Sequence, residues 1–341
     1  MKVFVTGIDG YLGSLLAPEL LRYGYEVIGL DTGYYKERML YSESGITPLT
    51  LAKDLRRIET DDLKGVDAVV HMAELSNDPA GQLAPEITYE INHKGSVRLA
   101  EIARSAGVRH FVYMSSCSVY GVAGADFVTE DSPTNPQTAY GICKTLVERD
   151  VRALANSQFA PTFLRNATAY GASPRMRFDI VLNNLAGLAW TTRNIQMTSD
   201  GQPWRPIVHG LDICQAIIAV LEAPVEAIAN EVFNVGNTEH NYRVKEIAEI
   251  VGEVFPGCKV SFGPSGSDNR SYRVSFEKIR KHLPKFNCRW DAKRGAKQLF
   301  DLFKRIDMTE EVFQCRAFTR LKQLEYLIRT RQIDNAFFWT Q

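Results

Sequence analysis

The sequence predicts an α/β protein built on a doubly wound parallel sheet, with a smaller, mostly C-terminal lobe. Three features indicate this fold class. Short apolar runs typical of strands alternate with stretches of helical periodicity over the first half of the chain. A glycine-rich turn follows the first of these runs, and the alternation stops near residue 167. Strands that alternate with helices of this length pair in parallel and are covered by helices on both faces.

The first unit extends from the N-terminus to residue 31. Residues 2 to 6 form a short apolar run, residues 12 to 23 have helical periodicity, and residues 26 to 31 return to a strand pattern. Pro18 lies inside the helical stretch and lacks a backbone donor, so we expect a kink or a displaced helix start. This βαβ unit of about 30 residues is typical of a Rossmann-type sheet.

The alternation continues to about residue 165. Further strands are expected at residues 68 to 71, 111 to 114 and 161 to 165, with helices at residues 88 to 106 and 139 to 156. We therefore predict that residues 1 to 166 form a Rossmann domain, to which a later segment near residues 205 to 235 returns.

The remaining chain has a different rhythm. Residues 167 to 308 contain loops rich in Gly, Ser, Pro and Arg, which predict a second lobe. Helices are expected there near residues 179 to 189, 211 to 221 and 244 to 254. Residues 309 to 341 predict a helical extension whose apolar side carries Phe313, Phe318, Leu321, Leu324, Leu327 and Ile328.

Composition and charge exclude several classes of protein. The 341 residues are 45% apolar, and 40 basic residues balance 40 acidic ones, so neither nucleic acid nor an anionic membrane is an expected partner. The chain shows no signal-peptide core and no run of about 18 apolar residues, so we expect a cytoplasmic protein. The six cysteines form no C-x-x-C pair and the six histidines have no ligand spacing, so no metal site is expected.

The glycine-rich turn predicts a dinucleotide site. Gly7, Gly10 and Gly13 follow a strand and open a helix, which lets the backbone approach a pyrophosphate at the positive helix end. Asp31 ends the second strand, where its carboxylate would accept hydrogen bonds from ribose hydroxyls and repel a 2′-phosphate. The expected cofactor is therefore NAD rather than NADP, although Lys36 and Arg38 follow closely.

A serine, a tyrosine and a lysine predict acid/base chemistry at a carbinol. Tyr140 and Lys144 are spaced i, i+4, so a helix would place the ammonium where it favours the phenolate. Ser116 could then hydrogen-bond the same substrate oxygen. Together with a nicotinamide cofactor, this set indicates hydride transfer at a carbon that bears a hydroxyl.

These residues belong to longer motifs, which are Thr6-Gly-x-x-Gly10-Tyr-Leu-Gly13, Asp31, Asp54-Leu55, Ser115-Ser-Cys-Ser-Val-Tyr-Gly121 and Tyr140-x-x-x-Lys144. Their conjunction resembles the extended short-chain dehydrogenase/reductase family, in its nucleotide-sugar epimerase/dehydratase branch, over about residues 1 to 300. The match is specific for the family and not for the substrate.

The resemblance implies a role for each matching position. Tyr140 would be the base, Lys144 would bind the nicotinamide ribose and lower the pKa of that tyrosine, and Ser116 would hold the substrate hydroxyl. Asn92 is similar to the family's structural asparagine beside the active site. Besides the three glycines and Asp31, the implied cofactor-binding residues are Tyr11, Leu12, Asp54, Leu55, Met72, Ala73, Asn92, Tyr140 and Lys144.

The resemblance also implies a substrate site in the second lobe. Arg205 matches the arginine that grips the nucleotide diphosphate, a task suited to a charged fork. Tyr272 lies where relatives place a residue that gates the sugar pocket, and its bulk would disfavour N-acetylated sugars. The expected substrate-binding residues are Ser76, Asn184, Arg205, Arg270 and Tyr272.

Several positions depart from the family pattern. Dehydratases of this branch place an acidic pair where Cys117 and Ser118 stand, so dehydration is disfavoured. Glu74 replaces a usually small residue. Relatives also often carry an asparagine at Thr168 and an arginine near Ser265, so the nucleotide base of the substrate is left open. Arg270, Arg175 or Arg177 could compensate. Cys117 is expected to be a packed thiol, since no histidine adjoins it.

Three hypotheses for the function follow. The first is a redox-neutral, NAD-dependent nucleotide-sugar epimerase. The second is a nucleotide-sugar ketoreductase or dehydrogenase with a dissociable cofactor, and the third is a catalytically quiet NAD-sensing or interaction protein. The family resemblance also implies a homodimer, with an interface near residues 97 to 106 and 147 to 154, which a monomeric mass in light scattering would contradict.

Overall fold

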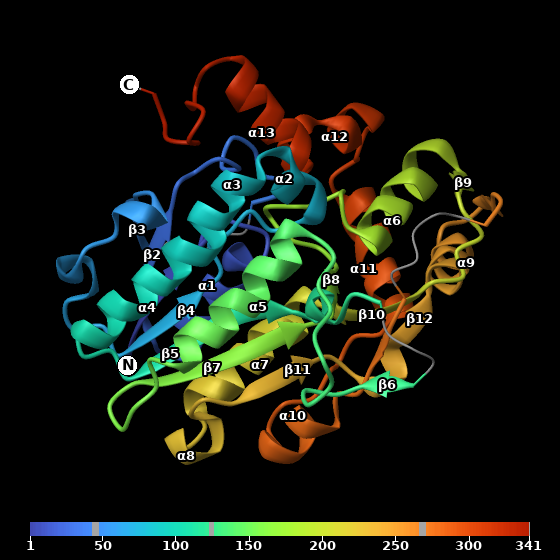
Figure 1. The fold of residues 1–341 in the computed structure, drawn as a ribbon. Helices are drawn as coiled ribbons and strands as arrows, with labels where there is room; N and C mark the ends of the chain where they lie inside the picture. The colour runs from blue at the N-terminus through green and yellow to red at the C-terminus, as the bar shows by residue number, and fades with distance from the viewer. Residues whose placement is uncertain (43–47, 123–125, 266–270, 341) are drawn as a thin grey trace.

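The computed structural model describes residues 1 to 42, 48 to 122, 126 to 265 and 271 to 340 (Figure 1). Its centre is a seven-stranded parallel sheet in the order β11-β7-β5-β4-β1-β2-β3, which confirms the predicted doubly wound fold. The strands are β1 (Lys2–Thr6), β2 (Glu26–Asp31), β3 (Leu49–Ala52), β4 (Ala68–His71), β5 (His110–Ser116), β7 (Ala160–Asn166) and β11 (Val232–Val235).

The strand order reverses between β1 and β4. From β1 the chain builds outward through β2 to β3, then crosses to β4 on the other side and builds outward through β5 and β7. In open sheets of this kind, ligands bind in the crevice beyond the carboxyl ends of the strands at this reversal. The topology therefore places a binding site beside the glycine turn, before any side chain is considered.

Helices cover both faces of the sheet because alternate residues of each strand are apolar on opposite sides. Val3 and Val5 pack in a core with α1 (Gly13–Arg22) and α7 (Gly210–Glu222). Phe4 lies between them in sequence and packs in a second core on the other face. There α4 (Ser96–Ser105) and α5 (Ala139–Arg152) lie side by side (Figure 1). Burial on both faces explains why the strands are almost continuously apolar.

The second lobe has its own apolar core and lies at one side of the sheet (Figure 1). Three mutually packed helices form it, α6 (Val181–Thr192), α9 (Val244–Val254) and α11 (Ala292–Arg305). A small sheet of β8 (Thr168–Tyr170), β10 (Trp204–His209) and β12 (Asn241–Arg243) connects this lobe to the cleft. Shorter elements complete the lobes: β6 (Phe127–Val128), β9 (Asn194–Gln196), β13 (Lys259–Ser261), β14 (Arg273–Val274), α8 (Val225–Ile228) and α10 (Glu277–His282).

The C-terminal extension folds back onto the first domain. It comprises α12 (Glu310–Gln314), a 3₁₀ turn (Arg316–Phe318) and α13 (Arg320–Arg329), followed by a segment that contacts the chain just after β2. Leu324 and Leu327 pack with Tyr34 and Leu75 in a separate apolar cluster beside α2 (Asp78–Leu83). The predicted apolar side of this extension is thus divided, since Leu324 and Leu327 pack in this cluster, whereas Phe313 and Phe318 pack in the core of the second lobe.

Some local elements differ from those that the sequence predicts. The helix around Pro18 starts at Gly13 and continues through the proline, so the displaced start is wrong. The stretch predicted as one helix at residues 88 to 106 begins earlier, as α3 (Pro85–Thr88), and includes a π-helical segment (Tyr89–Gly95) before α4. Neither β3 nor α11 was predicted. Among the described residues, no helix is both long and apolar enough to cross a membrane.

Candidate active site

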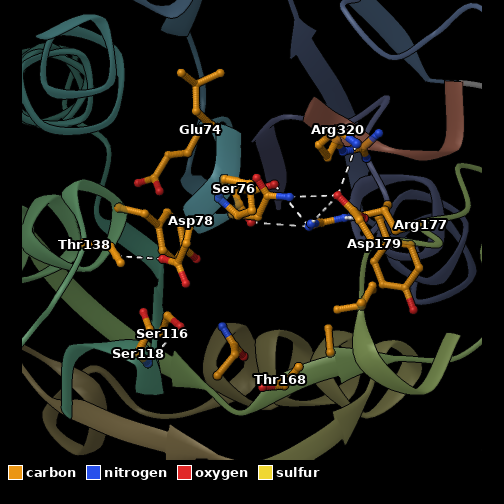
Figure 2. Close-up of a pocket in the computed structure, with 18 of the residues that line it drawn as sticks. Glu74, Ser76, Asp78, Ser116, Ser118, Thr138, Thr168, Arg177, Asp179 and Arg320 are labelled. Carbon is orange, nitrogen blue, oxygen red and sulfur yellow. Dashed lines mark hydrogen bonds and ion pairs between the residues drawn. The ribbon is translucent and has the colours of Figure 1, made fainter. Parts of the chain in front are cut away.

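A cleft of about 1100 Å³ opens at the strand reversal, between the sheet and the second lobe. Residues from both parts line it (Figure 2). Ser116 and Glu74 lie on one side of the opening in this view, and Arg177 and Arg320 lie on the other. The predicted cofactor, catalytic and substrate residues that line this cleft are Gly7, Gly10, Tyr11, Leu12, Gly13, Asp31, Asp54, Leu55, Met72, Ala73, Ser76, Ser116, Tyr140, Lys144, Arg205 and Tyr272.

The glycine turn is shaped for a close approach of the backbone. Gly7 has φ +73°, a conformation that favours glycine. A Cβ on Gly13 would lie 2.3 Å from the carbonyl oxygen of Gly7 and 2.4 Å from that of Ile8. Only glycine therefore allows α1 to start so close to β1, with its positive end toward the cleft. This cradle fits a pyrophosphate and hence the predicted dinucleotide.

Asp31 is held in place for a ribose. Its carboxylate accepts hydrogen bonds from the backbone N–H groups of Gly33 (2.7 Å) and Asp9 (3.1 Å). Burial raises the pKa of Asp31, and these two hydrogen bonds oppose that effect. The basic residues that follow in sequence, Lys36 and Arg38, do not line the cleft. The geometry around Asp31 thus fits an unphosphorylated ribose.

The serine, tyrosine and lysine converge as the sequence indicates. Ser116 ends β5, and α5 begins just before Tyr140 because the Thr138 hydroxyl caps it, accepting from Gly141 N–H at 3.2 Å. Thr138 also donates to Asp78 at 2.6 Å, which fixes this helix end against α2. Ser116 and Tyr140 both line the cleft, and the Lys144 Nζ lies 5.3 Å from the centre of the tyrosine ring.

Glu74 also lies in this site, although no role was predicted for it from the sequence. Its Oε2 lies 2.6 Å from Lys144 Nζ, and its Oε1 accepts a hydrogen bond from the Tyr113 hydroxyl at 2.7 Å. Lys144 also donates to the Met114 carbonyl. Both side chains of the ion pair are almost fully buried, at 5% and 2% exposed. In the sequence, the only indication of this ion pair was a glutamate at a position where the family usually has a small residue.

The charges of this group set the state of the tyrosine. Burial raises the pKa of Tyr140, Lys144 lowers it, Glu74 raises it again, and the net direction is upward. For Lys144, burial disfavours the ammonium, but the neighbouring carboxylate outweighs this and raises its pKa. The expected lowering by Lys144 is therefore present, yet burial and Glu74 exceed it. Tyr140 rests as a neutral phenol beside a cation.

The predicted substrate residues do not all lie in the cleft. The Arg205 guanidinium lies 5.9 Å from the Tyr272 ring centre, and Ser76 accepts a hydrogen bond from Arg177 at 3.3 Å. Asn184 does not line the cleft, since its amide donates to the Phe178 carbonyl at 2.9 Å. Arg270 lies outside the described residues.

Asn92 and Cys117 have structural surroundings. The Asn92 side chain is buried and exchanges two hydrogen bonds with the Leu75 backbone, at 2.8 and 3.0 Å, so it holds the segment that follows β4. Cys117 is buried with its thiol toward the Arg165 carbonyl, and burial raises the pKa of the thiol. Neither side chain lines the cleft. The described residues also contain no cluster of side chains that could hold a metal.

A second polar network, which the sequence did not predict, connects the two lobes. Arg177 pairs with Asp179 at 2.8 Å, and the same carboxylate accepts from Asn77 at 2.8 Å and from the backbone of Arg320 at 3.1 Å. It therefore joins the second lobe, the segment after β4 and the C-terminal extension. Arg175, also considered as a substrate residue, instead donates to backbone carbonyls of residues 36 and 38.

A Rossmann-type fold with a dinucleotide cradle and a serine–tyrosine–lysine group at its edge is typical of a nicotinamide-dependent enzyme. The chain belongs to the NAD dependent epimerase/dehydratase family, whose model matches residues 3 to 236. It thus uses the family's cofactor, NAD, as the sequence predicted.

Similarity to individual proteins supports this family assignment. The chain is 28% identical over 327 residues to the UDP-glucose 4-epimerase of Bacillus subtilis (strain 168), an alignment that covers 88% of this chain and 94% of that protein. A structure of MoeE5 in complex with UDP-glucuronic acid and NAD has a TM-score of 0.77 at 26% identity, over 89% of this chain and 99% of that one. The NAD-dependent NDP-hexosamine 5,6-dehydratase TunA has a TM-score of 0.79 at 23% identity, over 90% and 99%, which shows a shared fold alone.

Proposed function

We propose that this protein is an NAD-dependent nucleotide-sugar epimerase that oxidises a sugar carbinol transiently and then reduces it again. The observation that carries the proposal is the position of Tyr140 and Ser116. They lie in one continuous cleft with the dinucleotide cradle and with Arg205 and Tyr272 of the second lobe. A sugar bound there through its diphosphate could present a hydroxyl to the tyrosine.

The roles of the side chains follow from their surroundings. When bound, NAD⁺ supplies the oxidant, accepting a hydride from the carbinol carbon and later returning it. Tyr140 takes the hydroxyl proton as the carbon–oxygen double bond forms, and it gives that proton back when the hydride returns. The Ser116 hydroxyl donates a hydrogen bond to the same oxygen. Lys144 stabilises the phenolate while Tyr140 lacks its proton, and it would also hold the nicotinamide ribose.

The residues beside Ser116 argue against dehydration. Loss of water from the sugar needs an acid near the leaving hydroxyl, and Cys117 and Ser118 cannot supply a carboxylic acid. The Cys117 thiol moreover points to a backbone carbonyl. The retention of both Tyr140 and Lys144 in the cleft argues against a catalytically quiet sensor.

A ketoreductase is the second candidate, and Glu74 favours it. Burial raises the pKa of Tyr140, and Glu74, which pairs with Lys144, raises it further, so Tyr140 stays protonated, as the proton donor to a keto-sugar must be. An epimerase needs the same phenol to lose its proton first. The two candidates also differ in the cofactor. An epimerase keeps it bound through the whole cycle, whereas a ketoreductase exchanges it at each turnover.

The test is to incubate the purified protein, without added cofactor, with UDP-, dTDP-, GDP- and CDP-hexoses and to follow the anomeric protons by NMR together with product mass. The similarity to UDP-glucose 4-epimerases makes UDP-hexoses the first choice. A new isomer of unchanged mass is expected. Turnover only of a keto-sugar with added NADH or NADPH would instead support the ketoreductase, and loss of water would contradict both.

A further inference from the structure

The C-terminal extension covers the part of the cleft where the adenosine half of the dinucleotide is expected. Trp339 donates through its indole N–H to the Thr32 carbonyl at 2.6 Å, directly after Asp31. Arg56, which neighbours the Asp54-Leu55 pair, donates to the Ala336 carbonyl at 2.7 Å. The tail of the chain is thus hydrogen-bonded beside two predicted cofactor positions, Asp31 and the Asp54-Leu55 pair.

One side chain of this extension faces the cleft itself. Arg320 is the first residue of α13, is only 3% exposed, and lines the cleft (Figure 2). Its guanidinium carbon lies 4.0 Å from the centre of the Tyr35 ring. Within the described residues, its guanidinium makes no ion pair and no hydrogen bond, and only its backbone N–H is bonded, to Asp179.

The carboxylate that accepts from the Arg320 backbone is already engaged by other side chains. Asp179 accepts from Arg177 with both oxygens, and its Oδ2 also accepts from Asn77. Arg177 and Arg320 therefore share one carboxylate whose hydrogen-bonding capacity is filled by Arg177, Asn77 and a backbone N–H. The Arg320 guanidinium is attracted by the charges of Asp179 and Asp31 and stacks on Tyr35, but its N–H donors have no acceptor among the described residues. Buried donors without acceptors are costly.

Arg320 remains a cation at neutral pH. Burial, and then the charge of Arg177, lower its pKa to about 10, which still leaves it protonated at pH 7. Arg320 lines the cleft, and a planar guanidinium matches the geometry of phosphate oxygens, which accept two parallel hydrogen bonds. The ligand chemistry that satisfies it is therefore a phosphate or diphosphate.

We infer that Arg320 binds the diphosphate of NAD, so that the C-terminal extension completes the cofactor site. Two observations favour the cofactor over the diphosphate of the substrate. Arg320 stacks on Tyr35, which follows β2 on the dinucleotide side, and Arg205 is already placed beside Tyr272 on the other side. In Figure 2, Arg320 lies across the cleft from Ser116, where the nicotinamide end is expected. The adenosine-proximal phosphates would thus lie near Arg320.

The inference uses only the family's cofactor and does not depend on which sugar reaction occurs. Its readout is therefore the retention of NAD, and the readout of the proposed epimerase is product. Either can fail while the other holds.

The experiment compares Arg320→Gln and Arg320→Lys with the matched control Arg329→Gln, which changes an exposed arginine of the same helix. NAD that stays with the full-length protein during repeated buffer exchange is quantified by chromatography, and UDP affinity is measured by calorimetry. We expect Arg320→Gln to release NAD about 10- to 100-fold faster, since a charged hydrogen bond to phosphate is lost. UDP affinity should stay unchanged, and Arg329→Gln should behave as the parent protein does.

Salt and the lysine variant separate binding from folding. Salt should speed NAD release from the parent protein more than from Arg320→Gln, because the charge that salt screens is absent there. If Arg320→Gln unfolds, Arg320→Lys still tests the inference, because it keeps the charge and loses the fork, and intermediate retention is expected. Retention equal to that of Arg329→Gln in both variants would overturn the inference. Weaker UDP binding with normal NAD retention would overturn it too, by moving Arg320 to the substrate.

Discussion

The two halves of the cleft are built in different ways. The dinucleotide half is made by the carboxyl ends of β1, β2, β4 and β5, and its cradle is backbone held by a sheet that is buried on both faces. The substrate half is made by side chains that follow the sheet in sequence, such as Thr168 of β8, Arg205 of β10 and Tyr272. A rigid sheet edge supplies a constant site for the cofactor, and the substrate half is free to differ between relatives. The two halves should therefore respond differently to substitution.

The largest effect is expected where the halves meet. Tyr140→Phe removes the hydroxyl that transfers the proton, so turnover should fall about 10²- to 10⁴-fold. NAD retention and UDP affinity should remain at parental values, as measured by chromatography of bound NAD and by calorimetry. A Tyr89→Phe variant serves as the control, because that tyrosine does not line the cleft. Turnover that survives Tyr140→Phe would mean that another group is the base.

A substitution in the substrate half should affect the substrate alone. Arg205→Gln removes a charged fork from the expected diphosphate, so KM should rise about 10- to 100-fold while bound NAD stays constant. Steady-state kinetics and the ratio of NAD to protein check both statements. Loss of NAD together with a raised KM would show that the halves are not separable at this residue.

The converse substitution lies in the dinucleotide half. Gly13→Ala puts a methyl group within 2.4 Å of two backbone oxygens that cannot move without shifting β1 from α1. The free energy of unfolding should fall by about 1–3 kcal/mol, and NAD retention should fall with it. Chemical denaturation and NAD content measure these effects. Gly107→Ala offers a comparison, because there the added Cβ would meet nothing within 4 Å, although φ is +81°. Equal NAD loss in both variants would contradict the cradle.

The smallest expected change is one of pH dependence. Glu74 raises the pKa of Tyr140, so Glu74→Gln should lower that pKa. The phenolate would then form at lower pH, and the rising limb of kcat/KM for an oxidation that needs the phenolate should move toward acid. The exposed Glu90→Gln should leave the profile unchanged. A limb that moves toward alkali, or does not move, would show that Glu74 has no influence on the base.

The dinucleotide half was predictable because its signals are local. Gly7, Gly10 and Gly13 lie within one turn, and Asp31 ends the next strand, so a short stretch of sequence contains the geometry. Every expected cofactor residue except Asn92 lines the cleft, and Asn92 instead holds the backbone beside it. Sheet topology then brings the ends of β4 and β5 to the same edge without further information.

The features that the sequence did not predict depend on contacts between distant parts of the chain. Arg320 meets Asp179 across 141 positions, and no local pattern encodes that meeting. Asn184 was predicted from a motif, but the orientation of α6 directs its amide to the Phe178 carbonyl. The helix α11 did have a signal, since Ala292, Ala296, Leu299 and Phe303 are buried at helical spacing. The Glu74–Lys144 pair could not be predicted, because the segment after β4 and α5 come together only in the folded protein.

The most direct test of the central claim is a label-mixing experiment on the full-length protein, without added cofactor. Equal amounts of unlabelled UDP-hexose and the same UDP-hexose with a uniformly deuterated sugar are incubated together, and the products are analysed by mass spectrometry and NMR. If a resident cofactor returns each hydride to the sugar from which it came, every product molecule should be either fully deuterated or free of deuterium. Mixed labels, or an isomer that forms only when NAD or NADH is added, would contradict the account.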